Sequence, residues 1–175
     1  MKVNGKQKGN SQERKIANLL SEHFKVSTGL DQSFRRNPDS GSFWGATNQS
    51  RLQTHDTSKA SMGDIICPEG FTYNIECKFY KEPPSFNLLV KQDVKQWDDW
   101  VVQAKQDADN SKKKMCLIIK YNRVDEIVIL DKLPSGLKES FMYKNYYVMS
   151  LEHFLSQPDT EFLPNAQTII IPETL

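Results

Sequence analysis

The segment from residue 63 to residue 80 constrains the fold more than any other part of the chain. Two apolar runs, Gly63–Cys67 and Phe71–Tyr80, flank the tripeptide Pro68-Glu69-Gly70. This tripeptide suits a three-residue turn, because Pro favours the first turn position and Gly takes the left-handed one. We therefore expect a β-hairpin here.

Alternation divides the hairpin residues between two faces, because paired residues in neighbouring strands point the same way. One face is wholly apolar or aromatic and must belong to the core: it carries Ile65, Cys67, Phe71, Tyr73, Ile75, Cys77 and Phe79. The other face carries Asp64, Ile66, Thr72, Asn74, Glu76, Lys78 and Tyr80. Three charged side chains thus gather on one side of an otherwise apolar hairpin.

Helical and extended patterns alternate along the rest of the chain. Asn10 followed by Glu13 is a capping signature, and it predicts a helix over residues 10–24. A second, amphipathic helix is indicated by the spacing of Val90, Val94, Trp97, Val101, Ala104 and Ala108. Further strands are expected at 115–121, 126–130, 146–149 and 169–171, with a short helix at 151–155. The predicted fold class is α/β, with a mixed β-sheet flanked by helices.

The 175 residues suffice for one domain with a buried core. We expect a basic flexible arm over residues 1–9 and a single domain over 10–175, with its core at about 10–131 and a C-terminal extension at 132–175. Residues 35–61 are expected to form a long surface loop.

Composition excludes several classes of protein. No apolar run approaches the roughly 18 residues that span a bilayer, and the N-terminus lacks an apolar signal region, so we expect a cytoplasmic protein without a membrane segment. Three cysteines without a C-x-x-C pair argue against a disulfide scaffold or a zinc ribbon.

Charge is distributed unevenly along the chain. Residues 1–60 hold 10 Lys and Arg against 5 Asp and Glu, although the whole chain has a net charge of only +1. A polyanion such as DNA would meet this basic end first. The alternative is a solvated basic tail without a partner.

The polar face of the hairpin is the candidate site. In the expected register Asp64 stands opposite Asn74, and Glu76 is its diagonal neighbour at roughly 7–8 Å. Two converging carboxylates suit Mg²⁺, which prefers oxygen ligands, and the ammonium of Lys78 can orient a water or offset charge on a phosphate. The alternative is an ordinary solvated face. Charged residues inside apolar strands argue for the site, because an unpaired charge is costly there.

These residues resemble a known family. The chain has Gly63-Asp64, then eleven residues, then Glu76-Cys77-Lys78. This order matches the D-x(n)-E-x-K signature of the PD-(D/E)XK nuclease superfamily, with Gly63 where Pro is usual. The upstream sequence resembles archaeal-type Holliday junction resolvases and their phage-encoded relatives. The resemblance lies in the start of a helix at Lys8 to Arg14, followed by Arg36 and by Ser40-Gly41-Ser42. The resemblance covers about residues 6–121. The loop after Ser42 is longer than usual, and some fifty residues follow the family core.

The resemblance implies a restriction-endonuclease-like core and a metal-dependent DNA endonuclease, acting on four-way junctions as a homodimer. It assigns Glu13, Asp64 and Glu76 to a Mg²⁺ site, with Mn²⁺ as a substitute, and Lys78 to catalysis. Arg36, together with Ser40 or Ser42, would contact the scissile region. For a phage enzyme the host cytoplasm is the expected location.

Each assignment has an alternative. Glu13 is also a capping acid, and Ser40-Gly41-Ser42 also suits a plain turn. Gln92 and Gln96 open the second helix and either reach the site or are exposed. The expected phosphate contacts are Lys6, Lys8, Arg14, Arg35, Arg36, Lys112, Lys113 and Lys114. Two other functions stay open: a restriction or repair nuclease acting on duplex DNA, and a non-catalytic nucleic-acid-binding protein.

Overall fold

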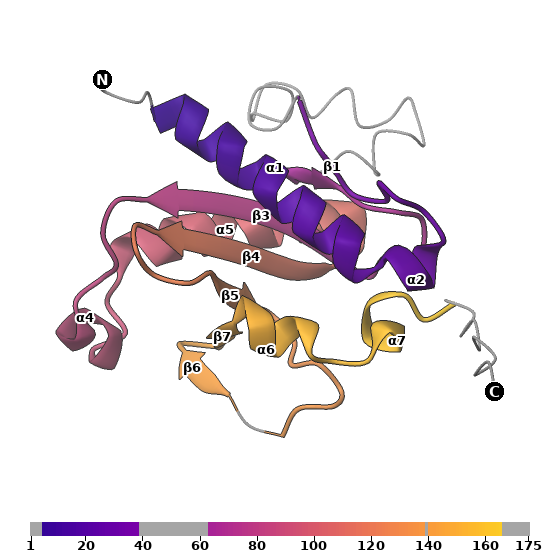
Figure 1. The fold of residues 1–175 in the computed structure, drawn as a ribbon. Coiled ribbons are helices and arrows are strands. Elements are labelled where there is room, and N and C mark those ends of the chain that lie inside the picture. The colour runs from indigo at the N-terminus through magenta and orange to yellow at the C-terminus, as the bar shows by residue number, and fades with distance from the viewer. Residues whose placement is uncertain (1–4, 39–62, 139, 166–175) are drawn as a thin grey trace, which may run out of the picture.

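A computed structural model describes residues 5–38, 63–138 and 140–165, in which a five-stranded sheet lies between two layers of helices (Figure 1). The order in the sheet is β3-β4-β5-β7-β6, in which β3 and β4 are parallel and all other neighbours are antiparallel. The strands are β3 (Tyr73–Tyr80), β4 (Lys114–Tyr121), β5 (Ile127–Leu130), β6 (Phe141–Tyr143) and β7 (Tyr146–Ser150). The predicted α/β class with a mixed sheet is confirmed.

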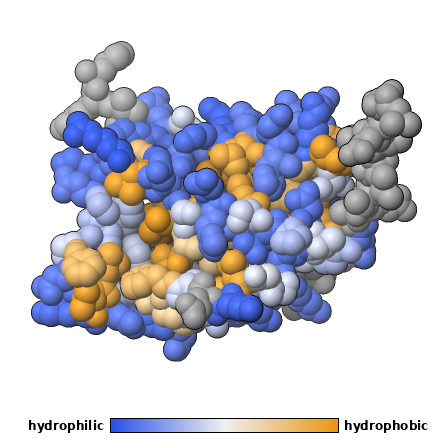
Figure 2. All heavy atoms as spheres, turned by 60° about the horizontal axis from the view of Figure 1, so that its bottom comes forward, coloured by the Kyte–Doolittle hydropathy of each residue, from blue (hydrophilic) through white to orange (hydrophobic). Residues whose placement is uncertain are grey.

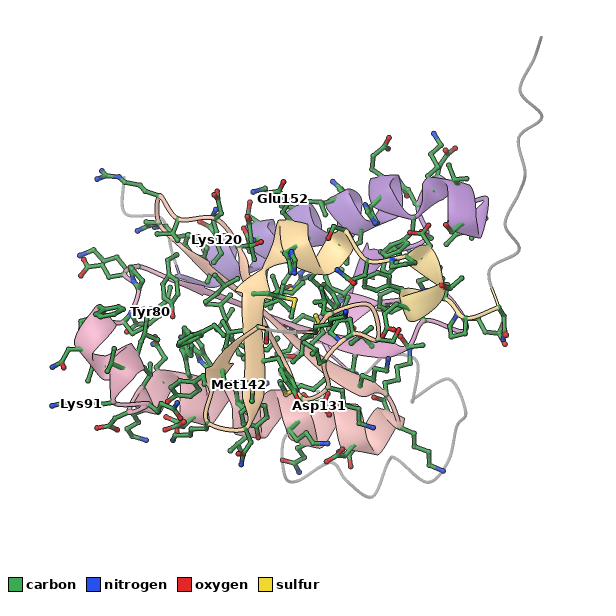
Figure 3. All side chains as sticks on the ribbon, turned by 90° about the horizontal axis from the view of Figure 1, so that it is seen from below. Tyr80, Lys91, Lys120, Asp131, Met142 and Glu152 are labelled. Carbon is green, nitrogen blue, oxygen red and sulfur yellow. The ribbon has the colours of Figure 1, made fainter. Side chains whose placement is uncertain are left out.

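Helices cover both faces of this sheet, as the view from below shows (Figure 3). They are α1 (Gly5–His23), α2 (Lys25–Thr28), α4 (Phe86–Val90), α5 (Lys95–Ser111), α6 (Leu151–Leu155) and α7 (Asp159–Phe162). Helix α5 is the crossover that a parallel pair such as β3 and β4 requires. None of the helices in the described part of the chain is both long and apolar enough to span a membrane.

Two apolar clusters form the core, one on each side of the sheet. Ile16 and Leu20 of α1, with Phe24 between α1 and α2, pack with Tyr73, Ile75 and Cys77 of β3 and with α6 and α7. On the opposite side α5 packs against β4 and β5 through Trp97, Val101, Ala104 and Ala108. The predicted apolar faces of β3 and α5 are therefore confirmed, and alternation along β3 turns its polar residues toward α5.

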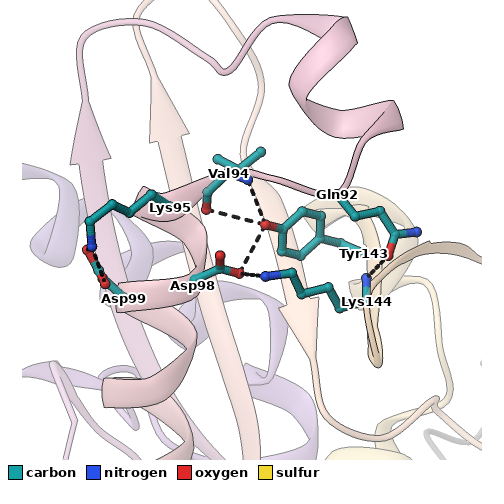
Figure 4. A network of polar contacts seen from close by, with 7 residues as sticks. All are labelled: Gln92, Val94, Lys95, Asp98, Asp99, Tyr143 and Lys144. Atoms are coloured by element: carbon teal, nitrogen blue, oxygen red, sulfur yellow. Dashed lines mark hydrogen bonds and ion pairs between the residues drawn. The ribbon is translucent and has the colours of Figure 1, made fainter.

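The start of α5 is fixed by the hairpin of β6 and β7 (Figure 4). The hydroxyl of Tyr143 accepts a hydrogen bond from the backbone N–H of Val94 at 2.9 Å and donates one to Asp98 at 3.0 Å. Gln92, left-handed with φ 53°, separates α4 from α5, and its side chain accepts a hydrogen bond from the backbone N–H of Lys144. Gln92 therefore serves this anchor and not the candidate site.

The expected start of the first helix is wrong. Helix α1 begins at Gly5, so residues 5–9 are helical rather than a flexible arm, and Asn10 lies inside the helix instead of capping it. These residues have no apolar side chain, so periodicity gives no signal there. Lys8 places its ammonium 5.6 Å from the ring centroid of Phe79, a contact that ties this end of α1 to β3.

The expected hairpin forms its turn but not its strand ladder. Phe71 donates a backbone hydrogen bond to Pro68, and Gly70 is left-handed with φ 79°. However, β2 (Ile65–Ile66) pairs with β1 (Arg35–Arg36) in a separate two-stranded sheet. The expected surface loop therefore begins with a strand, β1, whose partner β2 lies on the far side of residues 39–62 in the sequence.

Two other expectations need comment. Val90 belongs to the short helix α4 rather than to the buried stripe of α5, and 63% of it is exposed. Apolar atoms reach the surface at the left end of Figure 2, where α4 lies. The strands at 115–121, 126–130 and 146–149 and the helix at 151–155 are confirmed within a residue at each end. The strand expected at 169–171 lies outside the described residues.

Candidate active site

Asp64 is held against the edge of β3 by backbone contacts. Its N–H donates to the carbonyl of Ile75 at 2.9 Å, and its Oδ2 accepts from the N–H of Cys77 at 2.8 Å. The preceding residue, Gly63, has φ 85°, and a Cβ there would lie 2.7 Å from the carbonyl oxygen of Ile75. This close approach requires glycine, which explains why Gly63 replaces the usual Pro.

Glu76 projects from β3 toward α5 and is only 3% exposed. Its Oε1 accepts two hydrogen bonds at 2.8 Å, one from Nζ of Lys78 and one from Nε2 of Gln103 on α5. Burial and the nearby charge of Asp64 raise the pKa of Glu76 to about 8, against the opposing effect of Lys78. A buried carboxylate of this kind holds its charge only when a cation compensates it.

Lys78 is the cation of this group. Burial alone would lower its pKa, but the charge and hydrogen bond of Glu76 outweigh burial and raise the pKa above the usual value. The side chain is therefore an ammonium at neutral pH. It can donate hydrogen bonds and offset negative charge, but it cannot take a proton from water.

Glu13 reaches the same site from α1. Its Oε2 accepts a hydrogen bond from Nε of Arg36 at 2.6 Å, and Nη2 of Arg36 donates to Oδ1 of Asn10 at 2.9 Å. The capping interpretation of Glu13 is therefore wrong, because Asn10 lies in the body of α1 and its side chain accepts a hydrogen bond from Arg36 of β1. Burial and the charge of Asp64 raise the pKa of Glu13, while Arg36 and Lys78 lower it. The pairing of β1 with β2 brings Arg36 beside this group.

The three carboxylates share one arrangement. In each of them one oxygen is held by the protein, by Cys77, Arg36 or the Lys78 and Gln103 pair. Within the described residues the second oxygen of each, Oδ1 of Asp64, Oε1 of Glu13 and Oε2 of Glu76, accepts no hydrogen bond from the protein. Each of the three carboxyl groups thus keeps one oxygen that these protein contacts do not use.

A pre-formed protein cage for a metal is absent from the part of the chain that the structure describes. No three His, Cys, Asp or Glu side chains there lie close enough to hold an ion by themselves. This arrangement fits Mg²⁺, which is bound by one or two carboxylates together with several waters and substrate oxygens. It does not fit a structural zinc site, which needs four protein ligands.

Sequence reasoning missed two residues of α5 that face this group. Gln103 bonds both Glu76 and Lys78, whereas the sequence suggested only Gln92 and Gln96, with ordinary exposed helix residues as the favoured interpretation. Asp107, one turn further along, has its pKa raised by burial and by Asp64 and lowered by Lys78, which places it near the same carboxylates. In the sequence both residues occupy polar positions of an amphipathic helix, as exposed residues do. Only the packing of α5 against β3 shows that they face the carboxylates.

The expected phosphate contacts have different surroundings. Arg14, Arg35 and Lys112 are exposed, and Lys113 is half-buried. Lys114, by contrast, forms an ion pair with Glu161 and lies 5.1 Å from the ring centroid of Tyr73, so it has an internal role. Ser40, Ser42 and the side chain of Lys6 lie outside the described residues.

A basic groove lies where α5 ends and β3 begins. It has a volume of about 610 Å³, and Lys112, Lys113 and Lys132 line it together with Lys114 and Asp109. Neither Lys113 nor Lys132 forms an ion pair within the described ranges. The groove therefore adds Lys132 to the candidate phosphate contacts.

Comparison with known proteins gives one match. A family model described as "Phage putative PDDEXK endonuclease" matches residues 4–162, which is most of the chain. No curated protein and no solved structure matches it. The match spans α1, the carboxylate group and α5.

Proposed function

We propose that this chain, which belongs to the phage PDDEXK endonuclease family, is a metal-dependent endonuclease that hydrolyses phosphodiester bonds in DNA. One observation carries the proposal. Glu13, Asp64 and Glu76 converge from different elements, each with one oxygen held by the protein, beside the ammonium of Lys78. Neither packing nor surface solubility calls for a buried carboxyl such as Glu76, whose pKa is raised by burial and by the charge of Asp64.

Asp64 and Glu76 are the residues that would hold Mg²⁺, and Glu13 would support one of its waters. When bound, Mg²⁺ polarises the phosphate and makes a coordinated water a better nucleophile. The protein's part is to hold these carboxyl groups in position beside β3. The backbone N–H of Cys77 fixes Asp64, and the guanidinium of Arg36 fixes Glu13.

Lys78 would act on the phosphate rather than as a base. Its ammonium donates to Glu76 and Gln103 and has a third N–H for a water or a phosphoryl oxygen. A fixed positive charge stabilises the negative charge that develops during in-line attack. Removal of this charge should therefore slow hydrolysis more than it weakens DNA binding.

For the substrate we propose branched DNA, with the four-way junction as the preferred form. The motif order from Lys8 to Lys78 resembles that of junction resolvases. Arg14, Arg35 and the basic groove offer contacts to phosphates, which position DNA without reading its sequence. Symmetric cleavage of a junction needs two sites, so we also propose a two-fold homodimer, acting in the cytoplasm of the host cell.

The test is a cleavage assay on a four-way junction, a flap and a linear duplex of the same sequence, each with Mg²⁺, Mn²⁺ or EDTA. We expect the junction to be cut with either metal and to remain intact in EDTA. Equal cutting of the duplex would instead favour a restriction or repair nuclease. Binding that is equal in Mg²⁺ and EDTA, without any cutting, would contradict the enzymatic function.

A further inference from the structure

Gln103 occupies a place between the two residues of the Glu-x-Lys motif. Its Nε2 donates to Oε1 of Glu76 at 2.8 Å, and its Oε1 accepts from Nζ of Lys78 at 3.0 Å. Lys78 also donates to the same oxygen of Glu76 at 2.8 Å, so the three groups close a ring of hydrogen bonds. Gln103 lies on α5, the helix that connects the parallel strands β3 and β4, whereas Glu76 and Lys78 lie on β3.

An amide is suited to this place because it donates and accepts at once. A lysine ammonium is a point charge on a flexible four-carbon stem, so a single contact with Glu76 would leave it free to rotate. The second contact, with the carbonyl of Gln103, uses another of its three N–H groups and fixes the rotation. Both donors meet Oε1 of Glu76, which leaves Oε2 for a cation.

Stability does not explain the contact. Gln103 is an exposed residue of α5, while Glu76 and Lys78 already form an ion pair without it. When Gln103 is replaced, the buried Oε1 of Glu76 keeps its hydrogen bond from Lys78, so no buried acceptor is left without a donor and the cost to folding is small. The contacts of Gln103 instead fix the orientation of the Lys78 and Glu76 side chains.

We propose that Gln103 is a positioning residue for hydrolysis. It directs the third N–H of Lys78 toward the reacting phosphate or water and assigns Oε2 of Glu76 to the metal. This inference rests on the proposed nuclease function, and it adds a residue that the D-x(n)-E-x-K motif does not contain.

The test compares Gln103→Met, which keeps the length of the side chain but removes both hydrogen bonds, with Gln106→Met as the matched control. Gln106 lies on the same helix, is exposed, and makes no hydrogen bond within the described residues. The measurements are single-turnover cleavage of junction DNA at saturating enzyme, DNA affinity with Ca²⁺ replacing Mg²⁺, and the melting temperature.

We expect Gln103→Met to cleave about 10–100-fold more slowly, as is typical when a partner of an active-site ligand is lost. DNA affinity and melting temperature should stay at the wild-type values, and Gln106→Met should match the wild type throughout. Gln103→Glu keeps the acceptor for Lys78 but repels Glu76, so it should be at least as slow. A wild-type cleavage rate in Gln103→Met would overturn the proposal, as would a rate loss matched by lost affinity or stability.

A readout without DNA separates this inference from the nuclease function. The side-chain ammonium of Lys78 is observable by ¹⁵N NMR and assigned with Lys78→Arg. In Gln103→Met its signal should broaden through faster exchange with water, and in Gln106→Met it should not. If the wild type cuts no DNA, the proposed function fails, but this signal still shows whether Gln103 holds the ammonium of Lys78. A signal that does not change in Gln103→Met overturns the inference.

Discussion

Replacing Glu161 with Gln tests how the C-terminal helix α7 is held to the sheet. One carboxylate oxygen of Glu161 accepts from Lys114 and from the hydroxyl of Tyr73 at 3.0 Å. The other accepts from the backbone N–H of Ser135 at 3.1 Å and from its hydroxyl at 2.7 Å. A single side chain therefore joins α7 to β3, to β4 and to the loop after β5.

The magnitude follows from the pKa of this carboxyl. Burial alone would raise the pKa of Glu161, but hydrogen bonds from Lys114 and Ser135 lower it from 4.5 to about 2. At about 1.36 kcal/mol for each pH unit, this drop corresponds to about 3 kcal/mol of folding free energy. Because Lys114 is 31% exposed and screened by water, we expect about 2 kcal/mol. The melting temperature should then fall by about 4–8 °C.

The pH dependence has a definite sign. A lowered carboxyl pKa stabilises the folded state fully above the unfolded value of 4.5, and this stabilisation is lost as the pH falls toward about 2. The difference between wild type and Glu161→Gln should therefore shrink by about 1 kcal/mol between pH 7 and pH 3.5.

Urea unfolding followed by tryptophan fluorescence at both pH values measures this difference. Glu152→Gln is the control, because Glu152 is an exposed acid on α6 (Figure 3) and should leave stability unchanged. Equal stability of Glu161→Gln and wild type at pH 7 would refute the reasoning. A difference that does not change with pH would show that the carboxylate charge contributes nothing.

Three further outcomes are expected. Glu13→Gln keeps an acceptor for Arg36 but loses its charge, so cleavage should fall at least about 100-fold while thermal melting changes little; normal cleavage would remove Glu13 from the site. Gly63→Ala places a Cβ 2.7 Å from a backbone oxygen of β3, and it should lose more than about 1 kcal/mol of stability in urea unfolding. Neutralising Lys113 and Lys132 together should flatten the slope of log Kd against log salt by about 1–2, and an unchanged slope would place DNA elsewhere.

Local patterns in the sequence predicted the parts of the site that lie on one strand. Alternation along residues 73–80 separates the core face from the face that carries Glu76 and Lys78, and the structure confirms both faces. The turn at Pro68 to Gly70 also forms. These features depend on neighbouring residues alone, so a single sequence contains them.

The remaining parts depend on contacts between distant residues. Arg36 reaches Glu13 across 23 positions, and Gln103 reaches Glu76 across 27. The pairing of β1 with β2 crosses the undescribed residues 39–62, and no local pattern indicates it. Lys114 belongs to a basic run in the sequence, but its partner Glu161 lies 47 positions away. Charge patterns alone therefore could not separate binding residues from structural ones.

The central claim is that the carboxylate group around Glu76 hydrolyses DNA, and Glu76→Gln tests it most directly. Gln has nearly the same shape as Glu but is neutral, so it is a poor ligand for Mg²⁺. Wild type and variant are compared in Mg²⁺ on one labelled four-way junction, with DNA binding measured in Ca²⁺ and thermal melting recorded beside it. The account predicts that wild type cuts the junction, whereas Glu76→Gln binds it, melts no earlier and leaves it intact. Cutting by Glu76→Gln at the wild-type rate would contradict the account.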